Sequence, residues 1–268
     1  MKKLSFLLII ATFFVCCQEQ HSTITLLNDW KSFFDDHNVE GGIVIYELDN
    51  DKYQIYNEDW CKTGFLPAST FKIPNSLIAL ETNIITSNDT IYWDGVERFL
   101  PSWSENHVLK SAFAVSCVPC YQEFARNIGV ERMQKYTELA DYGNLEIRDT
   151  TIDNFWLVGN SSITPYEQVE FLTKLVQNEL PFRDTVITTV KDIMINEVGD
   201  NFTLRAKTGW SLMGEFDNGW FVGYLETKTK GTIIFAVNIQ RSMSESSDGF
   251  ARARKEIVMN IFKQLKYI

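Results

Sequence analysis

Apolar residues with strand-like spacing gather toward the two ends of the chain. Residues 42–48 and 52–57 form two short runs around turn residues at 49–51. Three further runs, rich in β-branched and aromatic residues, lie at 202–206, 219–226 and 232–240. Turn-like stretches separate these later runs. The five runs together predict one antiparallel sheet.

Between these runs the apolar spacing becomes helical. Thr164, Pro165 and Glu167 form a capping box with proline at the first helical position, ahead of apolar residues at helical spacing. Similar periods cover 121–128, 130–139 and 185–195, and the closing segment 250–265 is amphipathic. We therefore expect an α/β (α+β) fold, in which helices flank a sheet of five to six antiparallel strands. An all-helical lobe is inserted at roughly 85–195, and a ligand cleft is expected where the two parts meet.

The N-terminus has its own pattern. Lys2 and Lys3 precede an apolar run over 4–15, which Cys16, Cys17 and a polar stretch follow. This order is typical of a signal peptide, and the run is too short for a permanent membrane span. We expect residues 1–17 to be a signal peptide or a lipoprotein signal that ends at Cys17, 18–268 to form a single domain, and the protein to be exported to the periplasm. The pattern leaves open whether Cys17 becomes a lipid anchor.

Size and charge narrow the classes of partner. The 268 residues are 45% hydrophobic, so a core can form without disulfides. The net charge of -10 would be repelled by phosphate backbones, which argues against nucleic acid as a partner.

The cysteines raise two further hypotheses. Cys61, Cys117 and Cys120 remain inside the mature chain, and Cys117 to Cys120 spell a C-x-P-C typical of redox sites. Nothing around this segment predicts the βαβ setting of a thioredoxin, so a redox role is disfavoured. The three histidines lack ligand spacing to the cysteines, so no metal is expected. These histidines are His21, His37 and His107.

Ser69 and Lys72 form the first candidate pair. Pro67 and Ala68 precede them and an apolar-rich segment follows, so Ser69 should lie at the start of a helix. Three residues make nearly one helical turn, which brings the hydroxyl and the amine to the same face. A serine nucleophile needs such an adjacent base, and a helix N-terminus favours the developing alkoxide. A surface lysine one turn after a helix-capping serine would give the same S-x-x-K sequence. The pair alone therefore does not establish a catalytic site.

Lys207-Thr208-Gly209 form the second candidate element. They end the strand-like run 202–206, so the lysine and threonine side chains should emerge at a sheet edge, where Gly209 leaves room for a ligand. Lys62-Thr63-Gly64 spell the same letters without a strand before them. We interpret that second copy as a loop.

Ser116-Cys117-Val118 lie between these two elements in the sequence. They follow the apolar stretch 112–115 and precede a helix that opens at Pro119. A hydroxyl at Ser116 could pass a proton to a leaving nitrogen. Taken singly, the serine is better explained as an ordinary helix N-cap.

Ser-x-x-Lys, Ser-x-Val and Lys-Thr-Gly, in this order, resemble the motifs of the penicilloyl-serine transferases. Tyr142-Gly143-Asn144 and Phe155-Trp156-Leu157 narrow the resemblance to the class D (oxacillinase-type) serine β-lactamases. The likeness runs from about residue 42 to the last helix, including PASTFKIPNSLIALE and EQVEFL. It implies a β-lactamase/transpeptidase-like fold, hydrolysis of β-lactam antibiotics and hence resistance to them. The Ser-Asp-Asn pattern of class A fits residues 116–118 less well.

The resemblance implies a role for each matching residue. Ser69 is the nucleophile, and Lys72, carboxylated to N6-carboxylysine by CO2 or bicarbonate, is the general base for acylation and for release. Burial favours the neutral amine to which CO2 adds. Trp156 should donate a hydrogen bond to this carbamate, while Phe71 and Val118 keep the pocket dry. No other cofactor is implied.

The remaining motif residues contact the substrate in this interpretation. Ser116 and Lys207 relay a proton to the lactam nitrogen, and Tyr142 and Asn144 shape the cleft. Backbone N–H groups of Ser69 and Trp210 form an oxyanion hole, where one donor contributes about 3 kcal/mol. The carboxylate of the substrate is held beside Gly209, by Thr208 and by an arginine of the last helix. Arg-Lys-x-Ile favours Arg254, with Arg252 as the reserve.

Two other functions share these motifs. A β-lactam sensor domain would be acylated and stay so, but sensors carry membrane spans and a metalloprotease that this sequence lacks. A D,D-peptidase would act on peptidoglycan with the same nucleophile. Hydrolysis of penicillins, with cephalosporins or carbapenems undecided, is favoured because Trp156 serves deacylation. The sequence is compatible with a monomer or a dimer.

Overall fold

The computed structural model describes residues 22–244 and 249–268, so the predicted signal peptide with Cys17 lies outside the described residues. In the described part, one sheet has the order β1-β3-β2-β7-β6-β5-β4. All of its neighbouring strands pair antiparallel except β1 and β3, which are parallel. The strands are β1 (Thr23–Leu26), β2 (Glu40–Glu47), β3 (Lys52–Tyr56), β4 (Ile195–Val198), β5 (Phe202–Met213), β6 (Phe216–Thr227) and β7 (Gly231–Ser242).

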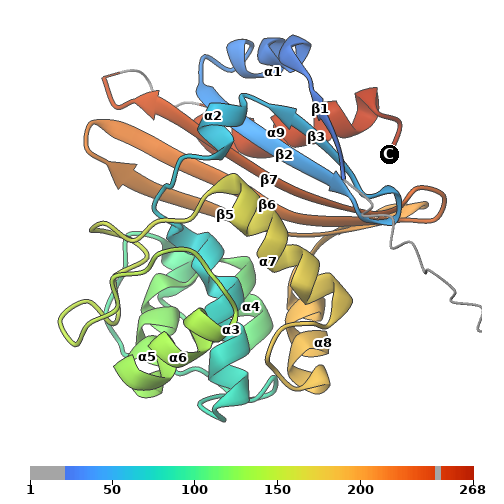
Figure 1. Cartoon of the computed structure of the whole chain (residues 1–268). Coiled ribbons are helices and arrows are strands. Elements are labelled where there is room, and N and C mark those ends of the chain that lie inside the picture. The colour runs from blue at the N-terminus through green and yellow to red at the C-terminus, as the bar shows by residue number, and fades with distance from the viewer. Residues whose placement is uncertain (1–21, 245–248) are drawn as a thin grey trace, which may run out of the picture.

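Helices pack on both faces of this sheet (Figure 1). They are α1 (Lys31–Asp35), α2 (Glu58–Cys61), α3 (Lys72–Glu81), α4 (Leu109–Ala114), α5 (Val118–Ile128), α6 (Val130–Leu139), α7 (Pro165–Gln177), α8 (Asp184–Ile193) and α9 (Phe250–Gln264). Short 3-10 helices are η1 (Asn28–Trp30), η2 (Leu48–Asn50), η3 (Ala68–Phe71) and η4 (Pro101–Trp103).

The two faces of the sheet bury separate hydrophobic clusters. On one face, residues such as Phe235 and Ile257 pack the sheet against α1 and α9. On the other face, α7 lies against β2, β6 and β7, and the cluster continues into the helical lobe through Phe71 and Leu77. Ser69 lies in η3, just ahead of α3, and η3 contacts β5 and β6 of the sheet. The two hydrophobic clusters, one on each face of the sheet, therefore fix the position of Ser69 between the sheet and the helical lobe.

The predicted fold class is confirmed, and each of the five predicted runs lies in a strand, except for the last residues of the first two runs, Leu48 and Asn57. The sheet has two additional strands, β1 and β4, which are four residues long and largely exposed, so neither has a clear apolar alternation. The predicted capping box is also confirmed. Thr164 Oγ1 accepts from Glu167 N at 3.1 Å, and Glu167 Oε2 accepts from Thr164 N at 2.7 Å.

The prediction that a strand ends before Lys207 is wrong. β5 continues through Lys207-Thr208-Gly209 to Met213, paired with β6 along its whole length. β4 pairs only with Thr203 to Arg205 on the other side of β5. Lys207-Thr208-Gly209 therefore do lie at a sheet edge, but in mid-strand. Lys62-Thr63-Gly64 form a loop after α2, as predicted.

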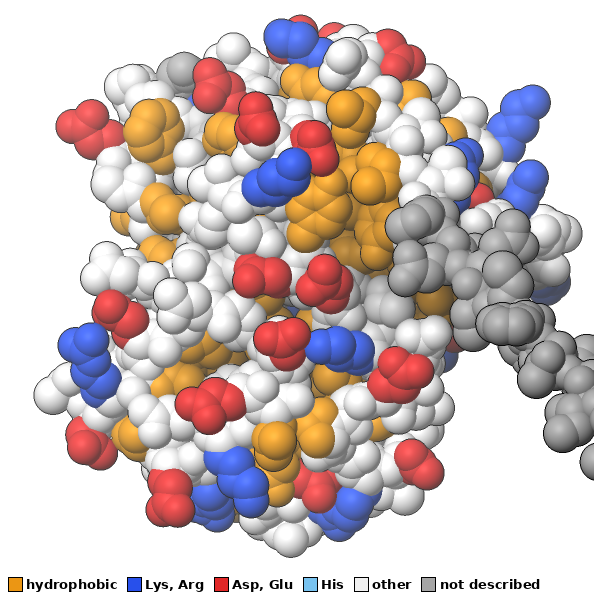
Figure 2. Space-filling model, in the orientation of Figure 1, with side chains coloured by type: hydrophobic (Ala, Val, Ile, Leu, Met, Phe, Trp, Pro, Cys, Tyr) orange, Lys and Arg blue, Asp and Glu red, His pale blue; other side chains and the backbone are white. Residues whose placement is uncertain are grey.

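Charged side chains of both signs are interspersed on the face shown in Figure 2. Within the described residues, no helix combines the length and the apolar character that crossing a membrane requires.

Candidate active site

Ser69 and Lys72 meet at the junction of η3 and α3. Lys72 Nζ donates to Ser69 Oγ at 2.9 Å, across one turn as the spacing predicts. Both side chains are buried, with exposed fractions of 8% for Ser69 and 1% for Lys72. The pair is therefore an enclosed hydroxyl and amine in direct contact, and the alternative of a surface lysine is excluded by this burial.

The environment of Lys72 favours a neutral amine. Burial lowers the pKa of Lys72 well below its usual value, and the charge of Lys207 lowers it further. A neutral amine can accept a proton or add CO2, which an ammonium cannot do. Lys72 Nζ also lies 5.2 Å from the ring centre of Tyr121, on α5.

Two non-glycine residues at the site have a left-handed backbone. Ala68, directly before Ser69, has a φ of 51°, and Ser116 has a φ of 58°. Such conformations cost on the order of 1–3 kcal/mol and persist where surrounding contacts impose them. Ala68 N donates to Trp156 O at 2.8 Å, and Ser116 N donates to Phe113 O at 3.1 Å. The strained positions are thus Ser116 itself and Ala68, the residue directly before Ser69.

Aromatic rings surround the Ser69–Lys72 turn. Phe71 stacks on Trp156 with ring centres 5.4 Å apart and meets Phe155 edge-on at 4.8 Å. All three rings are almost completely buried. The Trp156 indole N–H is also buried and has no hydrogen-bond partner within the described part of the chain. An unpaired buried donor costs roughly 1–3 kcal/mol, so this group suits an acceptor supplied beside it.

Lys207 extends from β5 toward the same lobe. Its Nζ lies 5.6 Å from the ring centre of Phe113, whose carbonyl binds Ser116 N. Burial, followed by the charge of Arg254, lowers the pKa of Lys207 to about 7. Lys207 therefore changes charge near neutral pH, which suits a proton relay. The Ser116 hydroxyl, like the Trp156 indole, is buried without a partner among the described residues.

Gly209 brings β5 against the nucleophile segment. A Cβ at Gly209 would lie 3.2 Å from Ala68 Cβ and from Pro67 O, and 3.3 Å from Thr70 Cγ2. We predicted that Gly209 leaves room for a ligand, but the space beside it is filled by the chain itself. The absence of a side chain lets the strand approach η3, which places the backbone of Trp210 next to this turn.

Arg254 reaches this edge from α9, and its guanidinium donates to Gly209 O. The side chain is 7% exposed and lies 5.7 Å from the ring centre of Trp210, and burial lowers its pKa to about 10. Arg252 is exposed on the same helix. The geometry thus points Arg254, rather than Arg252, at Lys207-Thr208-Gly209. Trp210 itself is 40% exposed and donates through Nε1 to Asp217 Oδ1 at 2.7 Å.

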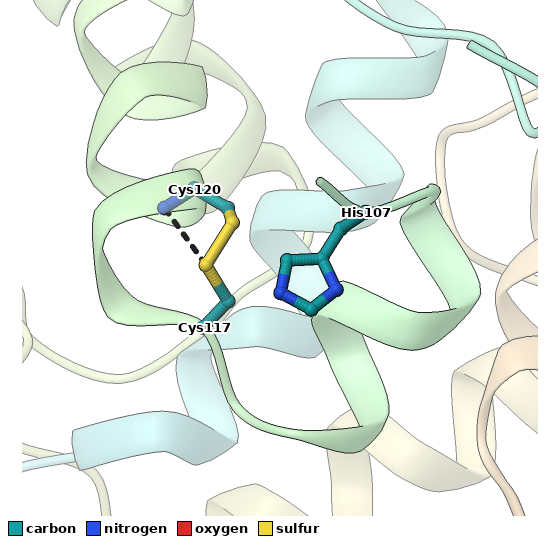
Figure 3. A group of neighbouring side chains, drawn as sticks. All are labelled: His107, Cys117 and Cys120. Atoms are coloured by element: carbon teal, nitrogen blue, oxygen red, sulfur yellow. Dashed lines mark hydrogen bonds between the residues drawn. A yellow bond between two sulfur atoms is a disulfide. The ribbon is translucent and has the colours of Figure 1, made fainter. Parts of the chain in front are cut away.

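Cys117 and Cys120 form a disulfide at the start of α5. His107 lies beside them (Figure 3), and one ligand atom from each of the three residues lies within 4.8 Å of the others. The sequence predicted that no histidine would lie where it could share a metal ion with the cysteines. This prediction is wrong, because the fold brings His107 next to Cys117 and Cys120. The chain passes through α4 and turns back at Ser116, and this reversal returns Cys117 to His107.

Several supporting residues were missed by the sequence reasoning. Gln168 Nε2 donates to Thr70 Oγ1 at 2.9 Å and to Tyr142 Oη at 3.3 Å, and Thr70 Oγ1 donates to Pro67 O at 2.7 Å. This buried network joins α7 to the Ser69 turn. Tyr142 thus belongs to the wall of the site, whereas the Asn144 side chain is exposed and its backbone pairs with Ser162.

Gly219 was also missed. A Cβ there would lie 2.8 Å from Arg254 Cδ, so its absence gives Arg254 its path across β6. A glycine inside an apolar strand is the one signal that could have indicated such a close approach.

Comparison with known proteins places this architecture in a family. The model for the penicillin binding protein transpeptidase domain matches residues 33–264. Beta-lactamase OXA-48 of Klebsiella pneumoniae is 38% identical over 240 residues, which cover 89% of this chain and 88% of that relative. The class D β-lactamase structure from Sebaldella termitidis has a TM-score of 0.86 at 34% identity, covering 92% of this chain and all of that one.

A penicillin-receptor domain is similar as well. The C-terminal domain of the Bacillus licheniformis BlaR penicillin-receptor has a TM-score of 0.84 at 33% identity, covering 92% of this chain and 98% of that chain. The fold and the Ser69–Lys72 pair thus define a penicillin-binding transpeptidase domain. Within that family, the chain belongs to the class D serine β-lactamases, which are hydrolases.

Proposed function

We propose that the protein hydrolyses β-lactam antibiotics through an acyl-enzyme on Ser69 and thereby confers resistance to them. The observation that carries this proposal is the buried Lys72 amine, 2.9 Å from Ser69 Oγ, in a chain of class D ancestry. The first step is attack of Ser69 Oγ on the lactam carbonyl while its proton passes to the Lys72 side chain. N–H groups of Ser69 and Trp210 would stabilise the oxyanion, because Gly209 brings these two segments together.

The leaving nitrogen needs a proton when the lactam C–N bond breaks. Ser116 supports this role because its buried hydroxyl is unpaired among the described residues, and Lys207 can supply the proton near neutral pH. Arg254 and Thr208 would hold the substrate carboxylate, since the guanidinium already contacts Gly209 O. Release follows when water attacks the acyl carbon and Ser69 takes a proton back.

We further propose that Lys72 is carboxylated by CO2. Its lowered pKa favours the neutral amine, and the unpaired indole N–H of Trp156 is an available donor for a carbamate oxygen. A carbamate would supply an oxygen base beside Ser69. Phe71 and Trp156, stacked and buried, would exclude water that could protonate and release it.

Turnover and mass measured together test this function. Purified protein should turn over a chromogenic cephalosporin or a penicillin, faster with added bicarbonate. Mass spectrometry after penicillin exposure should show an adduct on Ser69 that decays. A persistent adduct, without turnover, would favour the sensor function that the BlaR relationship raises. Turnover of D-Ala-D-Ala peptides alone would favour a peptidase.

The two Lys-Thr-Gly copies provide a matched test of Lys207. We expect Lys207→Ala to lower kcat/KM about 100-fold, and Lys62→Ala to change it less than twofold, because Lys62 lies on an exposed loop. Since Lys207 is protonated below a pKa of about 7, the wild-type rate should fall as pH rises through that value. Stopped-flow rates across pH would check both points. Equal effects of the two substitutions would exclude the relay.

We propose export to the periplasm, with Cys17 as a candidate lipid site. The Cys117–Cys120 disulfide supports an oxidising compartment. Fractionation of cells should place the protein outside the cytoplasm. Cys17→Ser should release it from the membrane fraction if Cys17 is lipidated, and retention of the leader in the mature mass would contradict export.

A further inference from the structure

His107, Cys117 and Cys120 form a buried cluster that the proposed reaction does not use. Their exposed fractions are 4%, 1% and 7%. One potential ligand atom of each lies within 4.8 Å of the other two, although two of the three atoms are joined in a disulfide. Figure 3 shows the imidazole facing the disulfide across the turn that precedes α5.

We propose that reduction of the Cys117–Cys120 disulfide by a dithiol creates a site that binds one Zn²⁺-class cation through both sulfurs and the His107 imidazole. A dithiol reductant transfers two electrons and two protons to the S–S bond and becomes a disulfide itself. Two thiols remain on the protein. Binding of the cation then displaces both thiol protons into solvent. The oxidised protein has no thiolates at this place and cannot bind in this way.

The start of α5 favours thiolates at this site. Cys117 is the N-cap of α5, and its Sγ accepts the N–H of Cys120 at 3.3 Å. The N-terminus of a helix stabilises negative charge and promotes the thiolate form. The Cα atoms of the pair are 5.5 Å apart. A tetrahedral zinc with Zn–S bonds of about 2.3 Å needs sulfurs roughly 3.8 Å apart, a separation that side-chain rotation can supply.

The imidazole is held in place by its own hydrogen bonds. One ring nitrogen of His107 lies 2.9 Å from Ser102 O, and the other lies 3.1 Å from Ser111 Oγ. When one nitrogen binds the cation, the other keeps a fixed partner. Zinc-binding histidines typically have this arrangement, in which the second nitrogen bonds to a carbonyl or another polar group.

The sulfurs can be reached from outside. A hollow of about 210 Å³ is lined by Cys117 and Cys120 together with Glu105 and Glu123. It offers a route for both the reductant and the cation, and a position for a water or carboxylate as fourth ligand.

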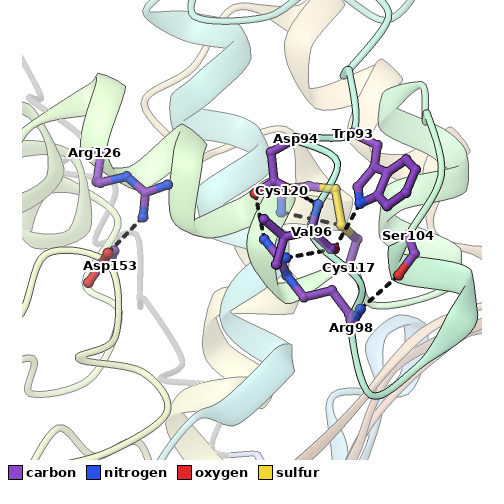
Figure 4. A network of polar contacts seen from close by, with 9 residues as sticks. All are labelled: Trp93, Asp94, Val96, Arg98, Ser104, Cys117, Cys120, Arg126 and Asp153. Carbon is purple, nitrogen blue, oxygen red and sulfur yellow. Dashed lines mark hydrogen bonds and ion pairs between the residues drawn. A yellow bond between two sulfur atoms is a disulfide. The ribbon is translucent and has the colours of Figure 1, made fainter.

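The charges around this hollow favour a cation. Arg98 is paired with Asp94 at 2.6 Å and Arg126 with Asp153 at 2.7 Å (Figure 4). Glu105 and Glu123 have no basic partner among residues 22–244 and 249–268, so their charges are not offset by an adjacent cation. The entrance is therefore electronegative, which opposes anions and attracts divalent metal.

Cobalt titration tests the site directly. Full-length protein would be reduced with dithiothreitol, desalted without oxygen and titrated with Co²⁺. We expect thiolate charge-transfer and tetrahedral d–d bands that saturate at one equivalent and disappear on addition of Zn²⁺. Cys120→Val should abolish these bands, and His107→Asn should weaken binding at least tenfold. Cys61→Ala, which removes a buried thiol elsewhere, should leave them unchanged.

A second measurement uses the unmodified protein and does not depend on the folding of any variant. Zn²⁺ should protect Cys117 and Cys120 of the reduced protein from alkylation by iodoacetamide, as mapped by peptide mass spectrometry. Absence of protection at these two residues would overturn the proposal. So would cobalt bands that persist in Cys120→Val, where Cys16, Cys17 and Cys61 remain, or bands of equal strength in the oxidised protein.

Discussion

Lys72→Ala should convert the protein into one that penicillin acylates slowly and that hardly releases product. In the proposed mechanism Lys72 supplies the base for both steps, and general base catalysis contributes about 10²–10⁴-fold, so we expect kcat to fall about 10³-fold. Ser69 keeps its place at the N-terminus of α3, which is why attack remains measurable. Intact-protein mass spectrometry would show the adduct accumulate over hours without decay.

Lys191→Ala is the control for this substitution. Lys191 is a partly buried lysine on α8, and its amine binds Val176 O and Asn178 Oδ1 instead of a serine hydroxyl. Its loss should leave turnover unchanged within about twofold. Circular dichroism would verify that both variants fold. Turnover of Lys72→Ala within tenfold of the wild type would refute the assignment of Lys72 as base.

Trp156→Phe should lower turnover at ambient CO2, and bicarbonate should restore most of it. The substitution removes the indole N–H and reduces the size of the ring, but a phenyl ring can still stack on Phe71. A hydrogen bond to a charged group contributes about 1.5–3 kcal/mol, so the carboxylated fraction of Lys72 should become 10- to 100-fold harder to maintain. Added bicarbonate raises the concentration of CO2, which restores the carboxylated fraction of Lys72 by mass action. Initial rates against bicarbonate concentration would measure the shift.

Trp30→Phe provides the matched comparison. Trp30 is 1% exposed and packs in the cluster on the opposite face of the sheet, beside α1 and α9. Its replacement should reduce stability but leave the bicarbonate dependence of the wild type. If Trp156→Phe stays inactive at every bicarbonate concentration, the carbamate hypothesis loses its support.

The parts of the site that the sequence could predict are local. The one-turn spacing of Ser69 and Lys72 depends only on helix geometry, and the capping box depends on the side chains and backbone N–H groups of Thr164 and Glu167, which are three residues apart. Strands with a strong apolar pattern were predictable for the same reason. In each case the residues that decide the structure are close together in the sequence.

The parts that could not be predicted depend on distant contacts. The parallel pairing of β1 with β3 joins residues 23–26 to 52–55, and β1 has almost no buried face that would signal it. The mid-strand position of Lys207 depends on β6, which continues the pairing past it. The proximity of His107 to Cys117 depends on how the chain reverses after α4. The number of residues between the two does not reveal this reversal.

Gly209 was correctly predicted to belong to the site, but the reason given for the glycine was wrong. The motif selected it, and we assigned its missing side chain to substrate access. The atoms facing it belong to Pro67, Ala68 and Thr70, about 140 residues earlier in the chain. Only the packed structure distinguishes space that a ligand needs from space that another segment already fills.

The position of Arg254 affects when the enzyme can first act. Ser69 and Lys72 are synthesised early, but the guanidinium that contacts Gly209 O belongs to the last helix and passes over Gly219 to reach it. A chain whose C-terminal helix has not yet been made therefore has Ser69 and Lys72 without the arginine that we propose binds the substrate carboxylate. If Arg254 holds the substrate carboxylate as proposed, productive recognition of penicillin must await docking of the C-terminal helix, so activity begins only after the last part of the chain has folded.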